Sequence, residues 1–399
     1  MPERCSHAAG RHGKNSRVIL SWILGGLALL SLALMIWQVY VAFRFPMHRR
    51  PEPAGFAPAV TILKPLKGCD AETRECLRSW LTQEYAGPVQ VVFGVASADD
   101  PVCEIVRGLI EEHRSCAAQL LICPQRLGAN AKVSQLLQMQ REARHELICI
   151  SDADVWAPAD FLTSAVVPLR DAAVGLTHSL YRVQTEANFA MRWEACAVNV
   201  DFWSQVLQSA SLKPVDFALG AAMLTTGRHL TEIGGFAGLV DHLADDYELG
   251  NRIARGGRRV ALCPVVVECR SGRQSLSEVW AHQLRWARTI RVCQPFPFFA
   301  SILSNASLWP LLWVAMSPAR VSAIGALICL FFRLQTAPHL EQRLAGRKTA
   351  SSRGMPVLKD LFQVAIWFLA FTGREVTWRG VRYRVETGGK LARGRPAGS

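Results

Sequence analysis

The sequence predicts an α/β fold with a mostly parallel sheet, accompanied by apolar membrane helices on both sides of it along the chain. Short apolar runs alternate with helical stretches between residues 58 and 155, and this alternation is typical of β-α units. Long uncharged segments lie near the N-terminus and again beyond residue 296. The first observation predicts the sheet, and the second predicts the membrane helices.

Length and charge limit the possible functions. The 399 residues suffice for one large domain with membrane segments, but not for two large enzymes. With 45 Lys and Arg against 32 Asp and Glu, the charge of +13 would suit nucleic acid, anionic lipid or phosphorylated small molecules. Basic residues gather beside the apolar segments, which favours a membrane and no nucleic acid as partner. These residues are Arg44, Arg49, Arg50, Arg343, Arg347, Lys348 and Arg353.

The twelve cysteines include no C-x-x-C pair, so the sequence contains neither a zinc ribbon nor a redox pair. We expect reduced thiols. Cys123, Cys149 and Cys263 lie in apolar runs, where they serve as small hydrophobic side chains.

The first element, after a tail at 1–17, is a transmembrane helix at 18–43. This stretch has no charged residue and is longer than the roughly 20 residues that a span needs. A cleaved signal peptide is the competing interpretation, but the run exceeds the usual hydrophobic region of such peptides and no A-x-A-like site follows it before Arg44.

One α/β domain is predicted at 44–295. Its expected strands and helices, in chain order, are a strand at 60–63, a helix at 73–81 and strands at 89–95, 120–123 and 147–150, then a strand at 223–226, a turn at 234–235, a helix at 246–255 and a strand at 260–267. Ligands of such sheets bind at the carboxyl ends of the strands, so those ends are where we expect the chemistry.

Asp152 and Asp154 form the sharpest local feature, a D-x-D pair at the end of the strand L-I-C-I-S. Their carboxylates suit Mg²⁺ or Mn²⁺, which take oxygen ligands and share them with substrate phosphates. A solvated turn is the alternative. A second acidic cluster at 245–248 opens a helix and is equally explained as a cap. A third, at Asp99 and Asp100, follows a strand and is equally a capped turn.

The stretch H-Q-L-R-W at 282–286 precedes the C-terminal apolar segments. Arg285 and Trp286 are explained either as an interfacial anchor or as a clamp on a diphosphate, because guanidinium groups match phosphate geometry.

These features occur in a fixed order: K-P-L-K-G at 64–68, Asp100, G-A-N-A-K at 128–132, the D-x-D pair, Asp246 and the R-W pair. This order resembles the ceramide glucosyltransferase family of inverting enzymes with the GT-A fold, and within it looks most like the bacterial hopanoid-biosynthesis-associated glycosyltransferases. The resemblance covers nearly the whole chain and ends on W-R-G-V-R-Y-R at 378–384, which is similar to the family's closing signature.

The resemblance implies a role for each matching residue. Asp100 contacts the nucleoside of the donor, Asp152 binds its diphosphate and metal, and Asp154 completes the metal pair. Asp246 is the catalytic base. Arg285 and Trp286 end the Q/R-x-x-R-W motif, whose first residue is here His282, a departure that puts the role of this position in doubt. Lys64, Lys67, Lys132 and Arg285 are candidates for further diphosphate contacts, with solvation as the alternative for Lys64 and Lys67. Gly220, with Ala221 and Ala222, either admits the acceptor or packs.

The resemblance further implies a UDP-sugar donor carrying N-acetylglucosamine or glucose, a divalent cation, and a lipid hydroxyl acceptor. A hopanoid polyol such as bacteriohopanetetrol is the preferred acceptor and ceramide the alternative. A processive polysaccharide synthase would need more membrane spans, a scaffold would not need acidic strand ends with an R-W motif, and a transporter would carry acidic residues within its spans.

The expected location is the bacterial inner membrane, with several spans and the catalytic domain in the cytoplasm, where nucleotide-sugars are made. Segments 298–316 and 321 onward should form a hairpin within 296–337, provided that Arg320 and Arg333 extend to the membrane surface. In the remaining region, 338–399, the apolar run at 361–372 is short and should lie at the interface, between a basic loop and a basic cytoplasmic tail.

Overall fold

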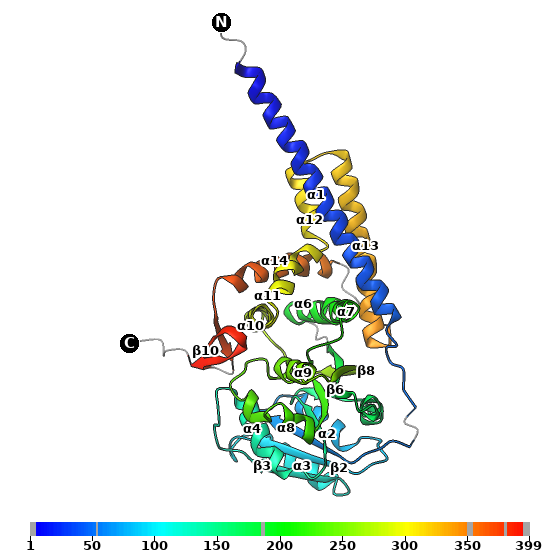
Figure 1. Cartoon of the computed structure of the whole chain (residues 1–399), viewed down its shortest axis with the longest axis vertical. Helices are drawn as coiled ribbons and strands as arrows, with labels where there is room; N and C mark the ends of the chain where they lie inside the picture. Colours follow the sequence, from blue (N-terminus) through cyan, green and yellow to red (C-terminus); the bar gives the residue numbers. More distant parts are fainter. Residues whose placement is uncertain (1–4, 53–54, 185–187, 349–353, 379–380, 394–399) are drawn as a thin grey trace, which may run out of the picture.

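A bundle of apolar helices stands on an α/β unit in the computed structural model (Figure 1). The structure describes residues 5–52, 55–184, 188–348, 354–378 and 381–393, with side chains from Arg17 onward. The α/β unit is built on a sheet of eight strands in the order β3-β2-β1-β4-β7-β6-β8-β5, and a separate three-stranded sheet lies near the C-terminus. The predicted fold class is confirmed.

The first half of the large sheet is parallel, as the alternation of strands and helices predicts. Strands β2, β1 and β4 pair in register along their apolar runs, and β3 pairs with β2 at the edge. The elements are β1 (Val60–Leu66), α2 (Thr73–Leu81), β2 (Val89–Val95), α3 (Val102–Glu112), β3 (Ala117–Ile122), α4 (Ala131–Met139) and β4 (Leu147–Ser151). Their carboxyl ends meet at one edge, where the predicted site residues follow.

The second half of the sheet is mixed. β7 (Ala222–Thr226) runs antiparallel to β4 and to β6 (Val174–Val183), while β8 (Arg259–Cys269) runs parallel to β6 and pairs at its end with the short β5 (Val155–Trp156). The sequence analysis missed β6. Its buried centre is Thr-His-Ser at 177–179, so it lacks the apolar run or clean alternation by which a strand is recognised.

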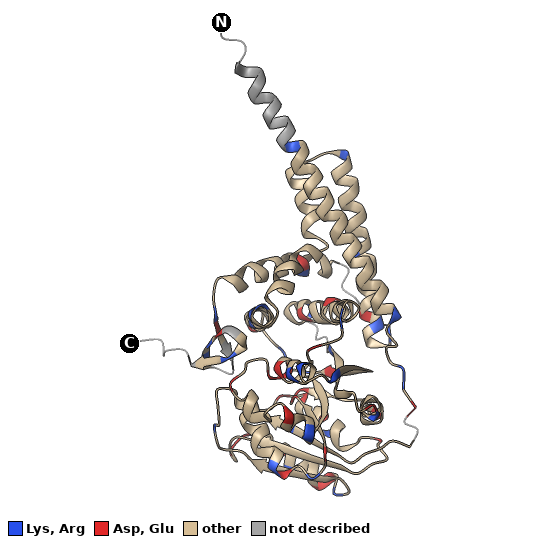
Figure 2. Ribbon diagram, viewed as in Figure 1, with Lys and Arg blue, Asp and Glu red and all other residues tan. Residues whose placement is uncertain are grey.

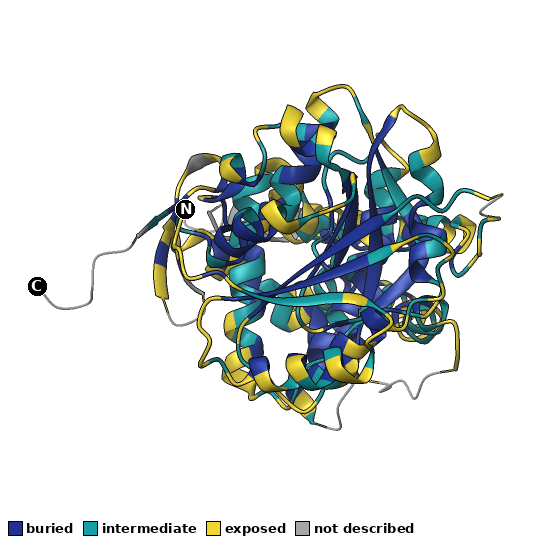
Figure 3. Ribbon diagram, turned by 90° about the horizontal axis from the view of Figure 1, so that it is seen from below, coloured by how far each residue is buried: buried dark blue, intermediate teal, exposed yellow. Residues whose placement is uncertain are grey.

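The core fills both faces of this sheet, and Figure 3 shows the strands as mostly buried inside a ring of exposed loops and helices. The largest fully buried side chains include Trp80, Trp193, Trp203 and Phe161. Shorter helices cover the sheet between its strands; they are α5 (Phe161–Ala165), α6 (Phe189–Cys196), α7 (Trp203–Ala210), α8 (Gly227–Glu232) and α9 (Asp245–Arg255). Gly234 and Gly235 both take positive φ in the predicted turn, where a side chain would be strained. All described cysteines from Cys69 onward are free thiols, as expected.

Two helices are long and apolar enough to cross a membrane among the described residues: α1 (Cys5–Arg44), from Arg17 onward, and α13 (Arg320–Ala345). Figure 2 shows the bundle almost free of charged residues between its ends. Helix α13 is more than twice as long as the uncharged run at 321–332, because it continues through Arg333 instead of ending there.

The expected first arm of the hairpin, 298–316, is bent, and its two halves together are apolar and long enough for a broken span or a re-entrant loop, so the hairpin stays a prediction. The arm is divided into α11 (Pro295–Ala300), a short 3₁₀ turn and α12 (Leu308–Met316), and the two halves are bent by 56°. The Asn305 side chain accepts hydrogen bonds from the backbone N–H groups of Ser307 (3.2 Å) and Leu308 (2.9 Å), and these bonds form a turn between the two halves just before α12 begins.

Arg333 points into the protein, and its place relative to a membrane surface stays a prediction. It is 2% exposed and pairs with Asp201 and Asp360 inside the protein. Helix α14 (Met355–Phe371) contains the run at 361–372 and lies crosswise to α1 and α13, between the bundle and the α/β unit (Figure 1). This arrangement agrees with an interfacial helix, which stays a prediction.

Candidate active site

Lys64 holds the backbone of the D-x-D segment by hydrogen bonds from inside the protein. It lies on β1, is fully buried, and donates to the backbone carbonyl of Asp152 (2.6 Å) and to the hydroxyl of Ser151 (3.2 Å). Burial lowers the pKa of Lys64 to about 8. The solvated interpretation is therefore wrong for Lys64, whereas Lys67 is exposed as that interpretation predicts.

Lys132 joins the two acidic clusters. Its ammonium group lies 2.7 Å from Asp152 Oδ1 and 3.1 Å from Asp245 Oδ2. Burial alone would lower the pKa of Lys132, but the carboxylates of Asp152 and Asp245 raise it well above its ordinary value. Asn130 caps the helix that carries Lys132 and also donates to the carbonyl of His242 (2.8 Å). The G-A-N-A-K segment thereby places the Lys132 ammonium group between the carboxyl end of β4 and the start of α9.

Asp246, beside Asp245 at the start of α9, takes no part in the Lys132 ion pairs, and its Oδ1 accepts the backbone N–H of Tyr247 (2.8 Å). Burial, followed by the charge of Asp245, raises the pKa of Asp246 to about 6. A Cβ at Gly220 would lie 2.8 Å from Asp246 Oδ2. The Asp246 carboxylate therefore packs against Gly220, and the choice between packing and admission of the acceptor stays a prediction.

Asp154 is exposed on its outer side, yet the surrounding protein removes enough of its hydration to raise its pKa to about 6, and Asp152 adds to this effect. Four carboxylates and two ammonium groups thus meet at this edge of the sheet. We call them the donor cluster; they are Asp152, Asp154, Asp245, Asp246, Lys64 and Lys132. With all groups ionised, the four carboxylates and two ammonium groups of the cluster carry a net charge of −2.

Asp100 lies on the same edge of the sheet, where its carboxylate binds backbone N–H groups of the neighbouring turns. Its two carboxylate oxygens accept the backbone N–H of Gly68, each at 3.0 Å, and one also accepts the N–H of Val102 at 3.1 Å. The capped-turn interpretation is confirmed for Asp100. The same contacts fix the glycine turn after β1, so contact with a donor nucleoside stays a prediction.

The stretch H-Q-L-R-W lies on α10 (Leu276–Cys293), whose start is fixed by a capping box between Ser275 and Glu278. His282 Nδ1 lies 2.6 Å from Glu194 Oε1, and its ring packs 4.5 Å from the ring of Trp286. Gln283 also donates to Glu194, at 3.3 Å. Glu194 is a residue that sequence reasoning missed, because its partner is 88 positions away.

Residues 22–391 match Glycosyl transferase family 21. The chain belongs to this family. It is 24% identical over 256 residues to ceramide glucosyltransferase 1 of Caenorhabditis elegans, covering 61% of this chain and 54% of that protein. It is 31% identical over 121 residues to a ceramide glucosyltransferase of Candida albicans, covering 28% of this chain and 22% of that protein. The chain spans about half the length of the nematode relatives it matches.

The fold of this family 21 member is similar to that of a mannosyltransferase from Pyrobaculum calidifontis, solved with GDP-mannose and Mn²⁺. The TM-score is 0.51 at 21% identity, covering 88% of this chain and 98% of that one. The predicted family and its GT-A-like fold are confirmed. The closer resemblance to hopanoid-associated enzymes is not shown by these relatives and stays a prediction.

The expected closing signature, at 378–384, lies in the small sheet, which contacts the loop before α4 and the segment around Asp241. Tyr383, on β10 (Val381–Val385), is buried and accepts a hydrogen bond from Arg126 (2.8 Å), which also donates to the carbonyl of Gly128 (2.7 Å). β10 pairs with β9 (Glu375–Trp378) and β11 (Leu391–Arg393), and Leu391 N donates to the carbonyl of Asp241 (2.7 Å). Arg379 and Gly380 of the signature lie outside the described residues.

A second group of charged residues, which sequence reasoning missed, lies where the bundle meets the α/β unit. Arg333 forms a two-bond fork with Asp201 (3.0 and 2.8 Å) and another with Asp360 (2.9 and 2.8 Å). Lys359 pairs with both carboxylates. We call these four residues the membrane cluster. Asp201 lies in a π-helical turn (Ala197–Phe202), and no local pattern in the sequence links it to α13 or α14.

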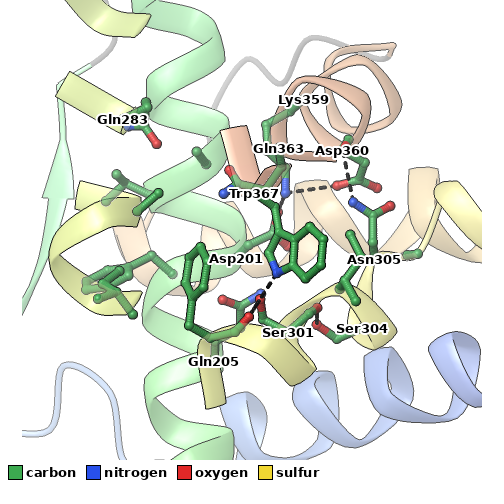
Figure 4. Close-up of a pocket in the computed structure, with 18 of the residues that line it drawn as sticks. Asp201, Gln205, Gln283, Ser301, Ser304, Asn305, Lys359, Asp360, Gln363 and Trp367 are labelled. Atoms are coloured by element: carbon green, nitrogen blue, oxygen red, sulfur yellow. Dashed lines mark hydrogen bonds and ion pairs between the residues drawn. The ribbon is translucent and has the colours of Figure 1, made fainter. Parts of the chain in front are cut away.

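A cavity of about 140 Å³ borders the membrane cluster (Figure 4). Its walls come from α1, α7, α10, α13, α14 and the bent segment around Asn305. Trp286 of the R-W pair forms part of the wall. Trp286 therefore faces a cavity at the bundle boundary, while His282, one turn earlier on α10, is near enough to Asp154 for its charge to lower the pKa of that carboxyl.

Proposed function

We propose that this chain transfers a sugar from a nucleotide-sugar to a lipid hydroxyl at a membrane surface. The observation that carries the proposal is the donor cluster, in which one open carboxylate, Asp246, lies beside a strand-end D-x-D pair and a buried lysine. Family membership and the names of the relatives, which are ceramide glucosyltransferases, support the same reaction class.

The D-x-D pair fits a divalent cation. The donor cluster has an excess of two carboxylates, and carboxylate oxygen is the donor atom that Mg²⁺ and Mn²⁺ prefer. Among the described residues, no three His, Cys, Asp or Glu side chains are arranged to hold a metal ion alone. Asp152 and Asp154 would therefore share the ion with the donor diphosphate, and the bound ion would act as a Lewis acid on the leaving group.

Asp246 acts as the base in this proposal. Its carboxylate accepts the proton of the lipid hydroxyl as the oxygen forms a bond to the anomeric carbon, while the bond from that carbon to the diphosphate breaks. A carboxyl group with a pKa of about 6 is ionised at neutral pH and is a stronger base than an ordinary aspartate. Direct displacement of this kind inverts the anomeric configuration. Lys132, held against Asp152, is placed to meet the negative charge of the departing diphosphate.

The finer assignments are parts of the proposal. The donor is UDP-glucose or UDP-N-acetylglucosamine, Asp100 contacts its nucleoside and Arg285 its diphosphate. The acceptor is ceramide or a hopanoid polyol; the names of the relatives favour ceramide. The catalytic unit faces the cytoplasm of a bacterial inner membrane, where nucleotide-sugars are available, and the two candidate spans anchor it.

The test is transfer by the purified full chain in lipid nanodiscs. Each radiolabelled UDP-sugar is incubated with ceramide, with bacteriohopanetetrol and with a total bacterial lipid extract, and the lipid phase is analysed by mass spectrometry. We expect one glycolipid product, absent with Asp246→Asn. Labelled polysaccharide instead would favour a processive synthase, and absence of any labelled product together with failure to bind UDP would favour a non-catalytic scaffold.

A further inference from the structure

A group of arginine side chains lies where α10, the end of α14 and the small sheet meet. Figure 1 shows the small sheet below the end of α14 and beside α10. Arg288 donates to the backbone carbonyl of Glu375 on β9, and Arg291 donates to the carbonyl of Gly373 (3.1 Å). A Cβ at Gly373 would lie 3.1 Å from Arg288 Nη2, so this glycine lets the guanidinium group lie against the backbone. Two side chains of α10 therefore hold the segment that follows α14.

These arginines are not neutralised by the protein. Within the described residues, four of them form no ion pair with a carboxylate: Arg288, Arg291, Arg374 and Arg384. The Nε–H groups of Arg288 and Arg291 are buried and find no acceptor in the part of the chain that the structure describes. Burial, followed by the charges of Arg374 and Arg288, lowers the pKa of Arg291. Like charges held together in this way favour the binding of an anion.

The arginines border an open groove of about 530 Å³, which we call the arginine groove. Its lining consists of Arg288, Thr372, Gly373, Arg374, Glu375 and Arg384. Three guanidinium groups and one carboxylate give this lining a net charge of +2. Guanidinium groups match the geometry of phosphate oxygens and bind them by pairs of parallel hydrogen bonds. The donor cluster contributes none of the described lining residues, so the groove is separate from the proposed site of transfer.

Exposed aromatic side chains continue from the arginines toward the helix bundle. The Arg291 guanidinium lies 5.6 Å from the centre of the Phe371 ring, at the end of α14. Three further rings on α11 and α14 are more than half exposed: Phe296, Phe299 and Phe368. Aromatic side chains collect at membrane–water interfaces, and basic residues beside them meet the anionic lipid head groups. If α14 lies at the interface, as predicted, the groove opens at the level of those head groups.

A lipid phosphate fits these surroundings better than a soluble phosphate. A soluble phosphate would contact the arginines alone, whereas the acyl chains of a lipid would also cover the aromatic rings beside them. Removal of that apolar surface from water adds to the binding energy in proportion to its area.

We propose that the arginine groove binds the phosphate head group of an anionic membrane lipid. Arg374 and Arg384 donate to the phosphate oxygens from the small sheet, and Arg288 adds its charge from α10. The bound lipid ties the small sheet to the membrane surface. The proposal requires that the chain is attached to a membrane, but it does not require that the chain transfers a sugar. The ligand is neither the donor nor the acceptor of the proposed reaction.

The first test is native mass spectrometry of the full chain, purified in detergent and titrated with phosphatidylglycerol or phosphatidylcholine. The variants are Arg374→Gln and Arg384→Gln, both at exposed positions of the groove. The matched control is Arg347→Gln, at an exposed arginine just beyond α13. We expect tighter binding of phosphatidylglycerol than of phosphatidylcholine, weakened about fivefold by each groove variant and unchanged in the control, since one basic residue contributes about this much toward anionic lipid. Equal binding of the two lipids, or an equal loss in the control, would overturn the proposal.

The second test separates a lipid from a soluble phosphate. Phosphatidylglycerol with a photoreactive group in the acyl chain, close to the glycerol, is cross-linked to the full chain in nanodiscs, and the labelled peptides are identified by mass spectrometry. We expect labelling at 296–299 and 368–375 that unlabelled phosphatidylglycerol reduces, but glycerol phosphate and UDP do not. Competition by glycerol phosphate would assign the groove to a soluble phosphate, and competition by UDP would assign it to the donor; either result, or labelling elsewhere, would refute the lipid site. No sugar donor is present, so such a failure leaves the proposed function intact.

Discussion

The two ion clusters of this molecule use the same residue types for opposite purposes. In the donor cluster, four carboxylates face two lysines, and two of those carboxyl groups have their pKa raised to about 6. In the membrane cluster, two carboxylates face one arginine and one lysine, and every charge is paired. The first cluster is left incomplete at a strand end, and the second is closed between helices.

This difference teaches how to separate charges that serve chemistry from charges that serve assembly. A buried ion pair is costly to break, because the remaining charge loses both water and partner. A closed cluster therefore fixes the elements that carry it, here α7 with its π-helical turn, α13 and α14. An open cluster with excess negative charge is ready for a cation, a proton or a substrate. The predictions below test the two clusters separately, by substitution, by removal of the cation and by change of pH.

Asp246→Asn should give the largest effect on activity. We expect turnover to fall by about 10²- to 10⁴-fold, the usual contribution of a general base, while UDP still binds. The protein should be slightly more stable near pH 7, since the substitution removes an anion that the folded state disfavours. Transfer rates, UDP titration and thermal unfolding check these points. Lost UDP binding with substantial residual turnover would show that Asp246 binds the donor and is not the base.

Arg333→Met should break the membrane cluster and destabilise the fold by about 3–5 kcal/mol, because Asp201 and Asp360 would share Lys359 alone. Thermal unfolding in detergent measures this. The control is Arg320→Met, at the exposed start of the same helix. Adding Asp360→Asn to Arg333→Met restores the charge balance and should recover part of the loss. An unfolding temperature equal to that of the Arg320 variant would mean that the cluster does not hold the helices together.

Removal of the cation should reduce donor binding and turnover by about 10²-fold, since a metal ion contributes several kcal/mol to charge stabilisation. Chelator and Asp154→Ala should have the same effect, and added Mn²⁺ should restore the chelated enzyme only. Isothermal titration of UDP with and without Mn²⁺ reports the binding part. Full activity in both conditions would exclude a metal role for Asp152 and Asp154.

The pH dependence of kcat/KM should show whether Asp246 of the donor cluster is the base. An ionised Asp246 accepts the proton, so kcat/KM should fall as pH drops through about 6, and not through the ordinary aspartate range near 4. The stability contribution has the matching sign: a carboxyl whose pKa is raised on folding favours the folded state at low pH and loses that contribution as pH rises toward 6. A kcat/KM that stays flat down to pH 5 would contradict the assignment.

His282→Gln should give the smallest effect. Glu194 accepts from His282 and also from Gln283, so a glutamine at position 282 can keep a hydrogen bond to the same carboxylate. We expect less than about a fivefold loss of turnover, because glutamine keeps a donor for the Glu194 carboxylate and less than one hydrogen bond is lost. Arg285→Ala should lose far more. The reverse ranking would show that the motif has been aligned wrongly on α10.

Much of the donor cluster could be predicted from the sequence. The strands before Asp152 and Asp100 are continuous apolar runs, and the helix after Asp245 begins with acidic residues, so local patterns located the strand ends and the helix start. The contact of Lys132 with both acidic clusters was not accessible, because its partners are 20 and 113 positions away in the chain. The same limit hid Glu194 behind His282.

By itself, the sequence determined the fold class, the family and the identities of the acidic residues, because these follow from periodicity, spacing and order along the chain. Only the tertiary structure decided which charges are open and which are closed. Arg333 lies between apolar residues at the end of the uncharged run 321–332, yet folding pairs it with Asp360 on α14 and with Asp201 from the α/β unit. Pairing is a property of distances between remote segments, and electrostatic energy depends on those distances and on burial, neither of which is written locally in the chain.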